Sequence, residues 1–246
     1  MKNFEIKNGV LIKYVGVDSV VTIPNSVSVI TDGAFRNNTS IKSVTIPNSV
    51  KLIGNYVFSN CSNLTSVTIP NSVERIGYDA FYECNSLTSV TLPNSITTID
   101  DNMFYNCSSL TSITIPNSIT TIGNGAFSGC SGLTTIVIPS SVTRIGDYAF
   151  SGTSLKSITI PNTVTSIGDG VFMGCVFLTS VKLPDSIKNI TYSMFDRCVS
   201  LKSIKIPDAV TSINDFAFAY CTSLVDKIIP DSVKNIANCA FYRCTL

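Results

Sequence analysis

Apolar residues recur along this chain at fixed intervals, and the pattern predicts a short strand in every unit of the repeat. In the stretch 64–84 the apolar positions are Leu64, Val67, Ile69, Val73, Ile76, Ala80, Phe81 and Cys84. Val67 and Ile69 alternate with polar Ser66 and Thr68, so they are expected on the buried face of a short strand. The Ile-Pro-Asn-Ser sequence that follows is typical of a turn.

The second half of the same unit predicts a different element. Between Ile76 and Cys84 the apolar residues are spaced by four, one and three positions. This spacing favours a short helical or 3-10 turn that packs against the core. Each unit is therefore expected to contain a strand, a turn, an extended stretch and a helical turn.

Proline and phenylalanine give the period of the unit. All ten prolines share one phase: Pro24, Pro47, Pro70, Pro93, Pro116, Pro139, Pro161, Pro184, Pro207 and Pro230. The step is 23 residues except between Pro139 and Pro161, where it is 22 because one residue is missing after Phe150. Ten of the 13 phenylalanines keep the same spacing. A repeat of this length indicates a solenoid, whose coils bury their apolar sides only against their neighbours.

The sequence thus predicts one α/β domain over residues 1–246, with repeats over 17–246. The expected fold is a right-handed solenoid of about ten 23-residue turns. A parallel β-sheet is expected on one face and short helical or 3-10 turns on the other.

The repeat resembles the BspA-like leucine-rich repeats of bacterial and protozoan surface proteins. The matching pattern is Leu-x-x-Val-x-Ile-Pro-x-x-Val-x-x-Ile-Gly-x-x-Ala-Phe-x-x-Cys, found at 64–84 and with small changes at 110–130. Residues 4–16 look like the hairpin that opens arrays of that family, so the resemblance implies a capping hairpin at 1–16 and a leucine-rich-repeat solenoid over 17–246. The resemblance implies a secreted or surface-attached protein that adheres to other molecules, although fold analogy does not name the ligand.

The leading functional hypothesis is accordingly a non-enzymatic binding or adhesion protein that contacts a protein or a glycan through its strand face. One alternative is an intracellular protein-interaction or structural array, located in the cytoplasm. A remote alternative is the binding of ice or another crystal surface by a regular lattice of serine and threonine.

Composition and charge narrow the partner classes. The chain has 17 basic and 16 acidic side chains, a net charge of +1, so no field steers it toward nucleic acid. No apolar run is long enough to cross a bilayer, and the first residues lack the apolar centre of a secretion signal. We therefore expect no nucleic-acid partner and no membrane span.

Enzymatic chemistry has no candidate residues in this sequence. The chain lacks histidine, which removes the usual activator of serine and cysteine nucleophiles and the commonest metal ligand. No phosphate-binding glycine loop is present. Asp185, Asp208 and Asp231 share the phase after proline and are expected to be solvated turn residues and not a calcium site. We expect no enzyme activity, no cofactor and no metal.

Eight of the nine cysteines occupy one phase, three residues after the repeated phenylalanine: Cys61, Cys84, Cys107, Cys130, Cys175, Cys198, Cys221 and Cys244. Parallel Cβ vectors oppose disulfides within such a column, and a straight column does not converge on a metal. Buried, reduced, space-filling thiols are expected. Cys239 is out of phase and is expected near solvent, where oxidation could couple two chains.

The candidate binding face consists of the polar strand positions. Its selected residues are Thr68, Thr91, Thr114, Ser157, Thr159, Lys182, Lys202 and Lys205. The middle of this face is rich in hydroxyl groups and its C-terminal third is basic. The tyrosines cluster around the repeated phenylalanine, where they either pack over the turns or form a second, aromatic surface.

Two positions depart from the pattern. Lys227 falls at an inward phase, and because an unpaired buried ammonium is costly we expect a bulge there or a lysine that reaches solvent. The end of the stack near Cys244 exposes strand edges, so weak self-association through it is expected.

Overall fold

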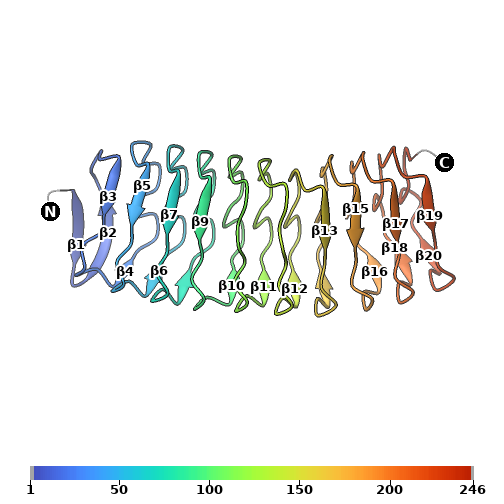
Figure 1. Ribbon diagram of the computed structural model, residues 1–246, viewed down its shortest axis with the longest axis horizontal. Coiled ribbons are helices and arrows are strands. Elements are labelled where there is room, and N and C mark those ends of the chain that lie inside the picture. Colours follow the sequence, from blue (N-terminus) through green and yellow to red (C-terminus); the bar gives the residue numbers. More distant parts are fainter. Residues whose placement is uncertain (1–2, 245–246) are drawn as a thin grey trace.

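The protein is an elongated stack of coils in a computed structural model that describes residues 3–244, leaving aside the side chains of 226–228. The two ends of the chain lie at opposite ends of the stack (Figure 1). The chain opens with an antiparallel hairpin of β1 (Phe4–Lys7) and β2 (Val10–Tyr14). All other pairings among the described strands are parallel.

One row of three-residue strands forms what we call the strand face. It comprises β3 (Val20–Thr22), β5 (Ser43–Thr45), β7 (Ser66–Thr68), β9 (Ser89–Thr91), β13 (Ser157–Thr159), β15 (Ser180–Lys182), β17 (Ser203–Lys205) and β19 (Asp226–Ile228). The strands pair in register, for example Val44 with Val67. In β3 to β17 the middle residue is buried and its two neighbours are exposed or half-buried, as the alternation predicts.

A second row of two-residue strands runs along another side of every coil, and we call it the second face. It comprises β4 (Val29–Ile30), β6 (Leu52–Ile53), β8 (Arg75–Ile76), β10 (Thr98–Ile99), β11 (Thr121–Ile122), β12 (Arg144–Ile145), β14 (Ser166–Ile167), β16 (Asn189–Ile190), β18 (Ser212–Ile213) and β20 (Asn235–Ile236). The hairpin joins this row, because β2 pairs with β4. The repeat and the parallel sheet are thus confirmed, and the stretch expected to be merely extended is a second sheet.

The predicted helical turns are wrong, since no residue in the described range 3–244 is helical. We call the segment around each repeated phenylalanine the Phe turn. Its backbone N–H groups donate alternately to carbonyls of the next coil and to carbonyls of their own coil. The Phe81 N–H donates to the Met103 carbonyl of the next coil at 2.9 Å, whereas the Tyr82 N–H donates to Asp79 in its own coil at 3.1 Å. Asp79 and Glu83 have φ of 53° and 56°, which interrupts any right-handed helix.

The core is built on a column of phenylalanine rings at the centre of the coils. From Phe35 to Phe241 the stacked neighbours have ring centroids 5.1–6.0 Å apart. The widest gap, 6.0 Å, separates Phe150 from Phe172 across the 22-residue unit. Tyr14 of the hairpin continues the column, stacking 5.2 Å from Phe35. Offset rings in buried stacks add to the burial of their apolar area.

Close contact between coils explains the glycine that follows the second-face strands. A Cβ atom on Gly77 would lie 2.7 Å from the backbone nitrogen of Asn55 and 2.7 Å from the carbonyl carbon of Gly54. Backbone atoms of a neighbouring coil cannot move aside as a flexible side chain can. Glycine holds this position in five coils, at Gly54, Gly77, Gly123, Gly146 and Gly168, and in those coils it permits the close backbone approach.

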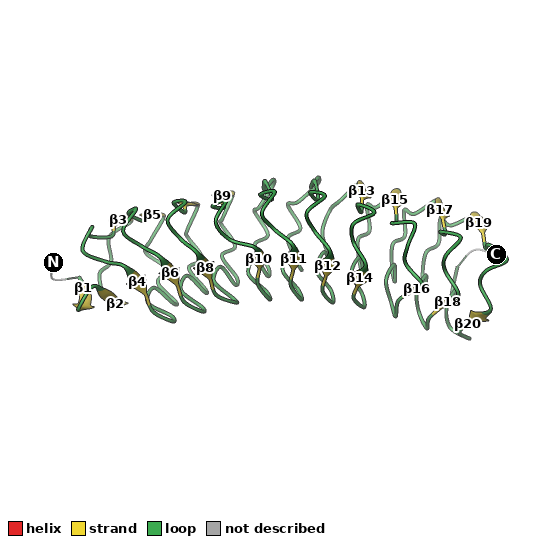
Figure 2. Ribbon diagram, turned by 90° about the horizontal axis from the view of Figure 1, so that it is seen from below, coloured by secondary structure: helices red, strands yellow, loops and turns green. Residues whose placement is uncertain are grey.

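The array is bowed, and the strand face lies on its outer side (Figure 2). The strand-face row divides into three sheets, β3 to β9, β13 with β15, and β17 with β19. Segments 112–114 and 135–137 hold strand positions between β9 and β13 but form no ladder. The second face opposite remains paired from β10 to β14. The outer row therefore opens where the inner row stays closed.

Candidate binding face

The structure places all eight predicted binding residues on the exposed side of the strand face. Each is exposed: Thr68, Thr91, Thr114, Ser157, Thr159, Lys182, Lys202 and Lys205. Neighbours on consecutive strands lie side by side, as Thr68 does with Thr91 and Thr159 with Lys182. Thr114 lies in segment 112–114, which forms no ladder with its neighbours. The eight candidate residues therefore extend across the break in the sheet and not along one continuous ladder. Their role in binding stays a prediction.

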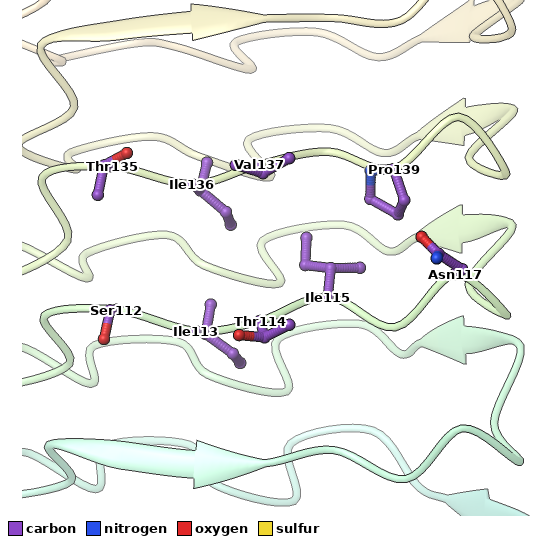
Figure 3. Close-up of a pocket in the computed structure, with 9 residues that line it drawn as sticks. All are labelled: Ser112, Ile113, Thr114, Ile115, Asn117, Thr135, Ile136, Val137 and Pro139. Carbon is purple, nitrogen blue, oxygen red and sulfur yellow. The ribbon is translucent and has the colours of Figure 1, made fainter.

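A groove lies between the two segments of that break. It has a volume of about 360 Å³ and is lined by Ser112, Ile113, Thr114, Ile115, Asn117, Thr135, Ile136, Val137 and Pro139. Figure 3 shows Ser112 and Thr135 at one end and Asn117 and Pro139 at the other. A second groove of about 470 Å³ runs along the far side of 135–137 and reaches Ser157, Thr159 and Pro161. The two grooves share that segment, and we call them together the central groove.

The central groove combines apolar walls with backbone groups of 112–115 and 135–138 that form no strand ladder. Among the described residues, no backbone hydrogen bond joins 111–115 to 134–138. By contrast, the Thr65 N–H donates to Lys42 at 2.8 Å and the Thr88 N–H to Thr65 at 3.0 Å in the paired region. Val137 is 77% exposed at this point. Concave, largely apolar sites with a few polar groups are typical of ligand binding.

The C-terminal part of the strand face is basic. Lys156, Lys182, Lys202 and Lys205 are exposed. In the described part of the chain, the ion pairs are Lys51 with Glu74 and Arg197 with Asp196, and none includes these four lysines. Their charges are available to a partner.

The backbone at Lys227 does not show the expected bulge, since β17 and β19 pair in regular register with Ile204 opposite Lys227. The lysine side chain lies outside the described residues, so its expected escape to solvent stays a prediction.

Three exposed apolar residues were missed by the sequence reasoning. Val176, Phe177 and Val199 are 39%, 55% and 36% exposed at the turn that leads from the Phe turn to the strand face. The sequence already showed these apolar residues as exceptions, because other coils carry serine or asparagine at the same positions, as at Ser62 and Asn63.

The tyrosines of the Phe turns lie away from the strand face, and most of them contact another aromatic ring. Tyr82 stacks on Tyr105 at 4.9 Å and Tyr56 meets Tyr78 edge-on at 5.0 Å. The Arg36 guanidinium lies 5.0 Å from the Tyr56 ring centroid. Tyr56, Tyr82 and Tyr105 are half-buried and Tyr78 is 38% exposed. Packing over the turns therefore accounts for much of this aromatic surface.

The expected burial of the cysteine column is confirmed for seven thiols, Cys61 through Cys221, and Cys244 is half-buried. Each thiol donates to the carbonyl of the phenylalanine in the preceding coil, as Cys130 does to Phe104 at 3.0 Å. Burial raises the pKa of the Cys130 thiol to about 12, so it stays protonated and unreactive at neutral pH. Thr153 takes the cysteine position in the short unit, 3.3 Å from the Cys175 sulfur. Cys239 is half-exposed, in keeping with its expected place near solvent.

Carboxylates on the turns are held by their neighbours. Asp185 is exposed and accepts a hydrogen bond from the Asn162 amide at 2.9 Å. Among the described residues, no three or more cysteine, aspartate or glutamate side chains form a group that could hold a metal ion. None of the described residues belongs to a helix that could cross a membrane.

Comparison with known proteins identifies the family. A family model described as BspA type leucine rich repeat region (6 copies) matches residues 13–134 and 126–246. The chain is similar to a leucine-rich repeat protein from Bacteroides ovatus, at 30% identity over 89% of this chain and 74% of that one, with a TM-score of 0.58. It is also similar to a leucine-rich repeat protein from Eubacterium ventriosum, at 23% identity over 93% and 77%, with a TM-score of 0.60.

A leucine rich cell surface protein from Faecalibacterium prausnitzii is 30% identical over 98% of this chain and 91% of that one, with a TM-score of 0.45. Comparison with curated proteins gives no match. The family model covers nearly the whole chain, including both the paired and the open parts of the strand face. The chain therefore belongs to the BspA-type leucine-rich-repeat family, whose members are generally non-enzymatic repeat proteins.

Proposed function

We propose that this protein is a non-enzymatic binding protein of the cell surface or the secreted fraction, and that it holds a protein or glycan ligand on its strand face. The observation that carries the proposal is the central groove, where exposed apolar and hydroxyl side chains adjoin backbone groups without a strand partner. Family membership supports the surface location.

The groove suits a ligand with both apolar and hydrogen-bonding groups. Val137 supplies exposed apolar contact over the largely buried Ile113 and Ile136, while Ser112 and Thr135 supply hydroxyls. Free N–H and C=O groups on the two segments add donors and acceptors that the scaffold holds in place. An extended peptide edge or a sugar ring presents matching groups, and both stay within the proposal.

Ice or crystal binding has less support. That activity needs a flat and regular lattice, whereas the strand face is bowed and its ladder is interrupted at 112–114 and 135–137. Measurement of thermal hysteresis tests it directly, and we expect none. The intracellular alternative is tested by protease treatment of intact cells that express the native gene, where a surface protein is degraded and a cytoplasmic one survives.

Binding is tested on arrays of host matrix proteins and glycans. A variant with Thr114→Glu, Thr135→Glu and Val137→Glu, all of which line the central groove, should lose saturable binding by at least about tenfold, since interface energy concentrates in a few central contacts. Tyr78→Ser on the Phe turns is the matched control and should bind normally. Retained binding in the triple variant together with loss in the control would move the site to the tyrosine side.

A further inference from the structure

Exposed apolar side chains gather at one corner of the solenoid, in two adjacent coils. Val176 and Val199 hold the same position in successive units, and Phe177 follows Val176. The corresponding residues elsewhere are polar or glycine: Ser62, Asn63, Asn85, Ser86, Ser108, Ser109, Ser131, Gly132, Thr222 and Ser223. The coil geometry therefore does not require apolar residues here. An aromatic ring that is 55% exposed without a structural need points to a partner.

Lysines flank this corner on the strand face. The Thr179 N–H, two residues after Phe177, donates to the Lys156 carbonyl at 2.9 Å, so Lys156 lies in the coil before it. Lys202 holds the position of Thr179 in the coil after it. With strands about 4.8 Å apart, the two lysines begin about 10 Å from each other and lie on either side of Phe177. Lys182, in the coil of Phe177, and Lys205, in the coil of Lys202, share another phase.

The four lysines concentrate positive charge on this part of the strand face. Neither ion pair found among the described residues includes any of them. The other exposed positions of β13, β15 and β17 are Ser157, Thr159, Ser180 and Ser203, which carry no charge. The whole chain has a net charge of only +1, so this concentration of positive charge is local. Such a field favours an acidic partner through charge complementarity.

We propose that Phe177, Val199, Lys156, Lys182, Lys202 and Lys205 form a basic–apolar patch that binds an acidic peptide segment of a partner protein. The carboxylates of the segment lie against the lysines, and one of its apolar side chains packs on Phe177. A sulfated glycan would satisfy the lysines but has no apolar side chain for the three exposed apolar residues. The proposal rests on the proposed function as a binding scaffold, but it uses residues outside the central groove.

The test uses fluorescence anisotropy with the full chain and a fluorescein-labelled peptide in which glutamates flank a central phenylalanine and leucine. We expect saturable binding that weakens as salt rises through about 0.15 M, where screening acts over about 8 Å. Phe177→Ser should weaken binding at least about tenfold, and so should Lys202→Gln combined with Lys205→Gln. These residues are exposed, so the fold should not change, and circular dichroism checks this.

Matched controls lie at the other end of the same face. Lys42→Gln removes an exposed lysine in the phase of Lys202, and Val20→Ser removes a side chain that is 67% exposed. Both should leave peptide affinity unchanged. A peptide with glutamine in place of glutamate, or with serine in place of its apolar pair, should bind at least about tenfold more weakly.

Three results would overturn the patch. They are no saturable binding of the acidic peptide at low salt, affinity indifferent to Phe177→Ser, or binding of a heparin fragment that needs the lysines but not Phe177. The last result would assign the lysines to a sulfated glycan. The pair Thr91→Glu with Thr114→Glu should leave peptide binding intact, so loss at the groove and loss at the patch are separate outcomes.

Discussion

Removal of one ring from the centre of the phenylalanine column should destabilise the whole array. Phe127 is fully buried between Phe104, at 5.4 Å, and Phe150, at 5.6 Å. A buried Phe→Ala substitution costs about 3–5 kcal/mol in transfer and cavity terms. Phe127 also has aromatic neighbours on both sides, so Phe127→Ala should lie in the upper half of that range.

The assay is urea denaturation followed by far-ultraviolet circular dichroism, with amide hydrogen exchange in the flanking coils because repeat arrays can unfold in segments. Phe241→Ala is the matched control, since this ring is half-buried and stacks 5.1 Å from Phe218 at the end of the array. It should cost about half as much as Phe127→Ala. A loss below about 1 kcal/mol for Phe127→Ala, or equal losses for the two variants, would refute the column as the source of stability.

Four further predictions concern other parts of the chain. Gly77→Ala should lower the free energy of unfolding by at least about 2 kcal/mol, because its Cβ would meet the Asn55 backbone at 2.7 Å, and an unchanged urea midpoint would contradict this. Burial raises the pKa of the Cys130 thiol to about 12, so above pH ~8.5 the unfolded chain loses a proton that the native state keeps. Stability should therefore fall as pH rises from about 9 toward 12, and Cys130→Ala should reduce that slope by about 1.4 kcal/mol per pH unit, whereas an identical slope would count against the buried thiol. Cys239 should react fastest with Ellman's reagent in the native protein. A rapid phase that survives Cys239→Ser would show that Cys239 is not the accessible thiol. Self-association through the last coil should appear as a concentration-dependent sedimentation coefficient that Ile236→Lys abolishes, since Ile236 is 46% exposed; the same association in the variant would exclude this edge.

The repeat could be predicted from the sequence because each apolar phase performs one packing task in every coil. Val67 and Ile69 alternate inward, Phe81 joins the ring column, and Cys84 fills the space behind it. The Phe turn could not be predicted in the same way. Asp79 adopts positive φ, a conformation that costs an ordinary non-glycine residue about 1–2 kcal/mol and that aspartate tolerates better than most. The hydrogen bond from its own N–H to the Asp101 carbonyl of the next coil, at 3.0 Å, helps to offset that cost, and apolar spacing does not reveal such a bond.

The eight candidate residues of the strand face followed from simple alternation, and their exposure agrees with it. The central groove did not follow, because Ser112, Ile113 and Thr114 repeat the chemistry of Ser66, Val67 and Thr68. The ladder is interrupted there all the same, so the local residue chemistry does not by itself decide whether neighbouring coils pair. Phe177 is different, because its departure from the serine and asparagine of other coils was visible in the sequence.

The central claim, that the strand face binds the ligand at its open middle, is tested most directly by amide hydrogen–deuterium exchange of the full chain with and without a captured partner. In the free protein the amides of 112–115 and 135–138 should exchange faster than those of β7, since they lack inter-coil bonds. In the complex these two segments should become the most strongly protected part of the chain. Protection confined to the tyrosine-bearing Phe turns, with 112–115 and 135–138 unchanged, would contradict the account.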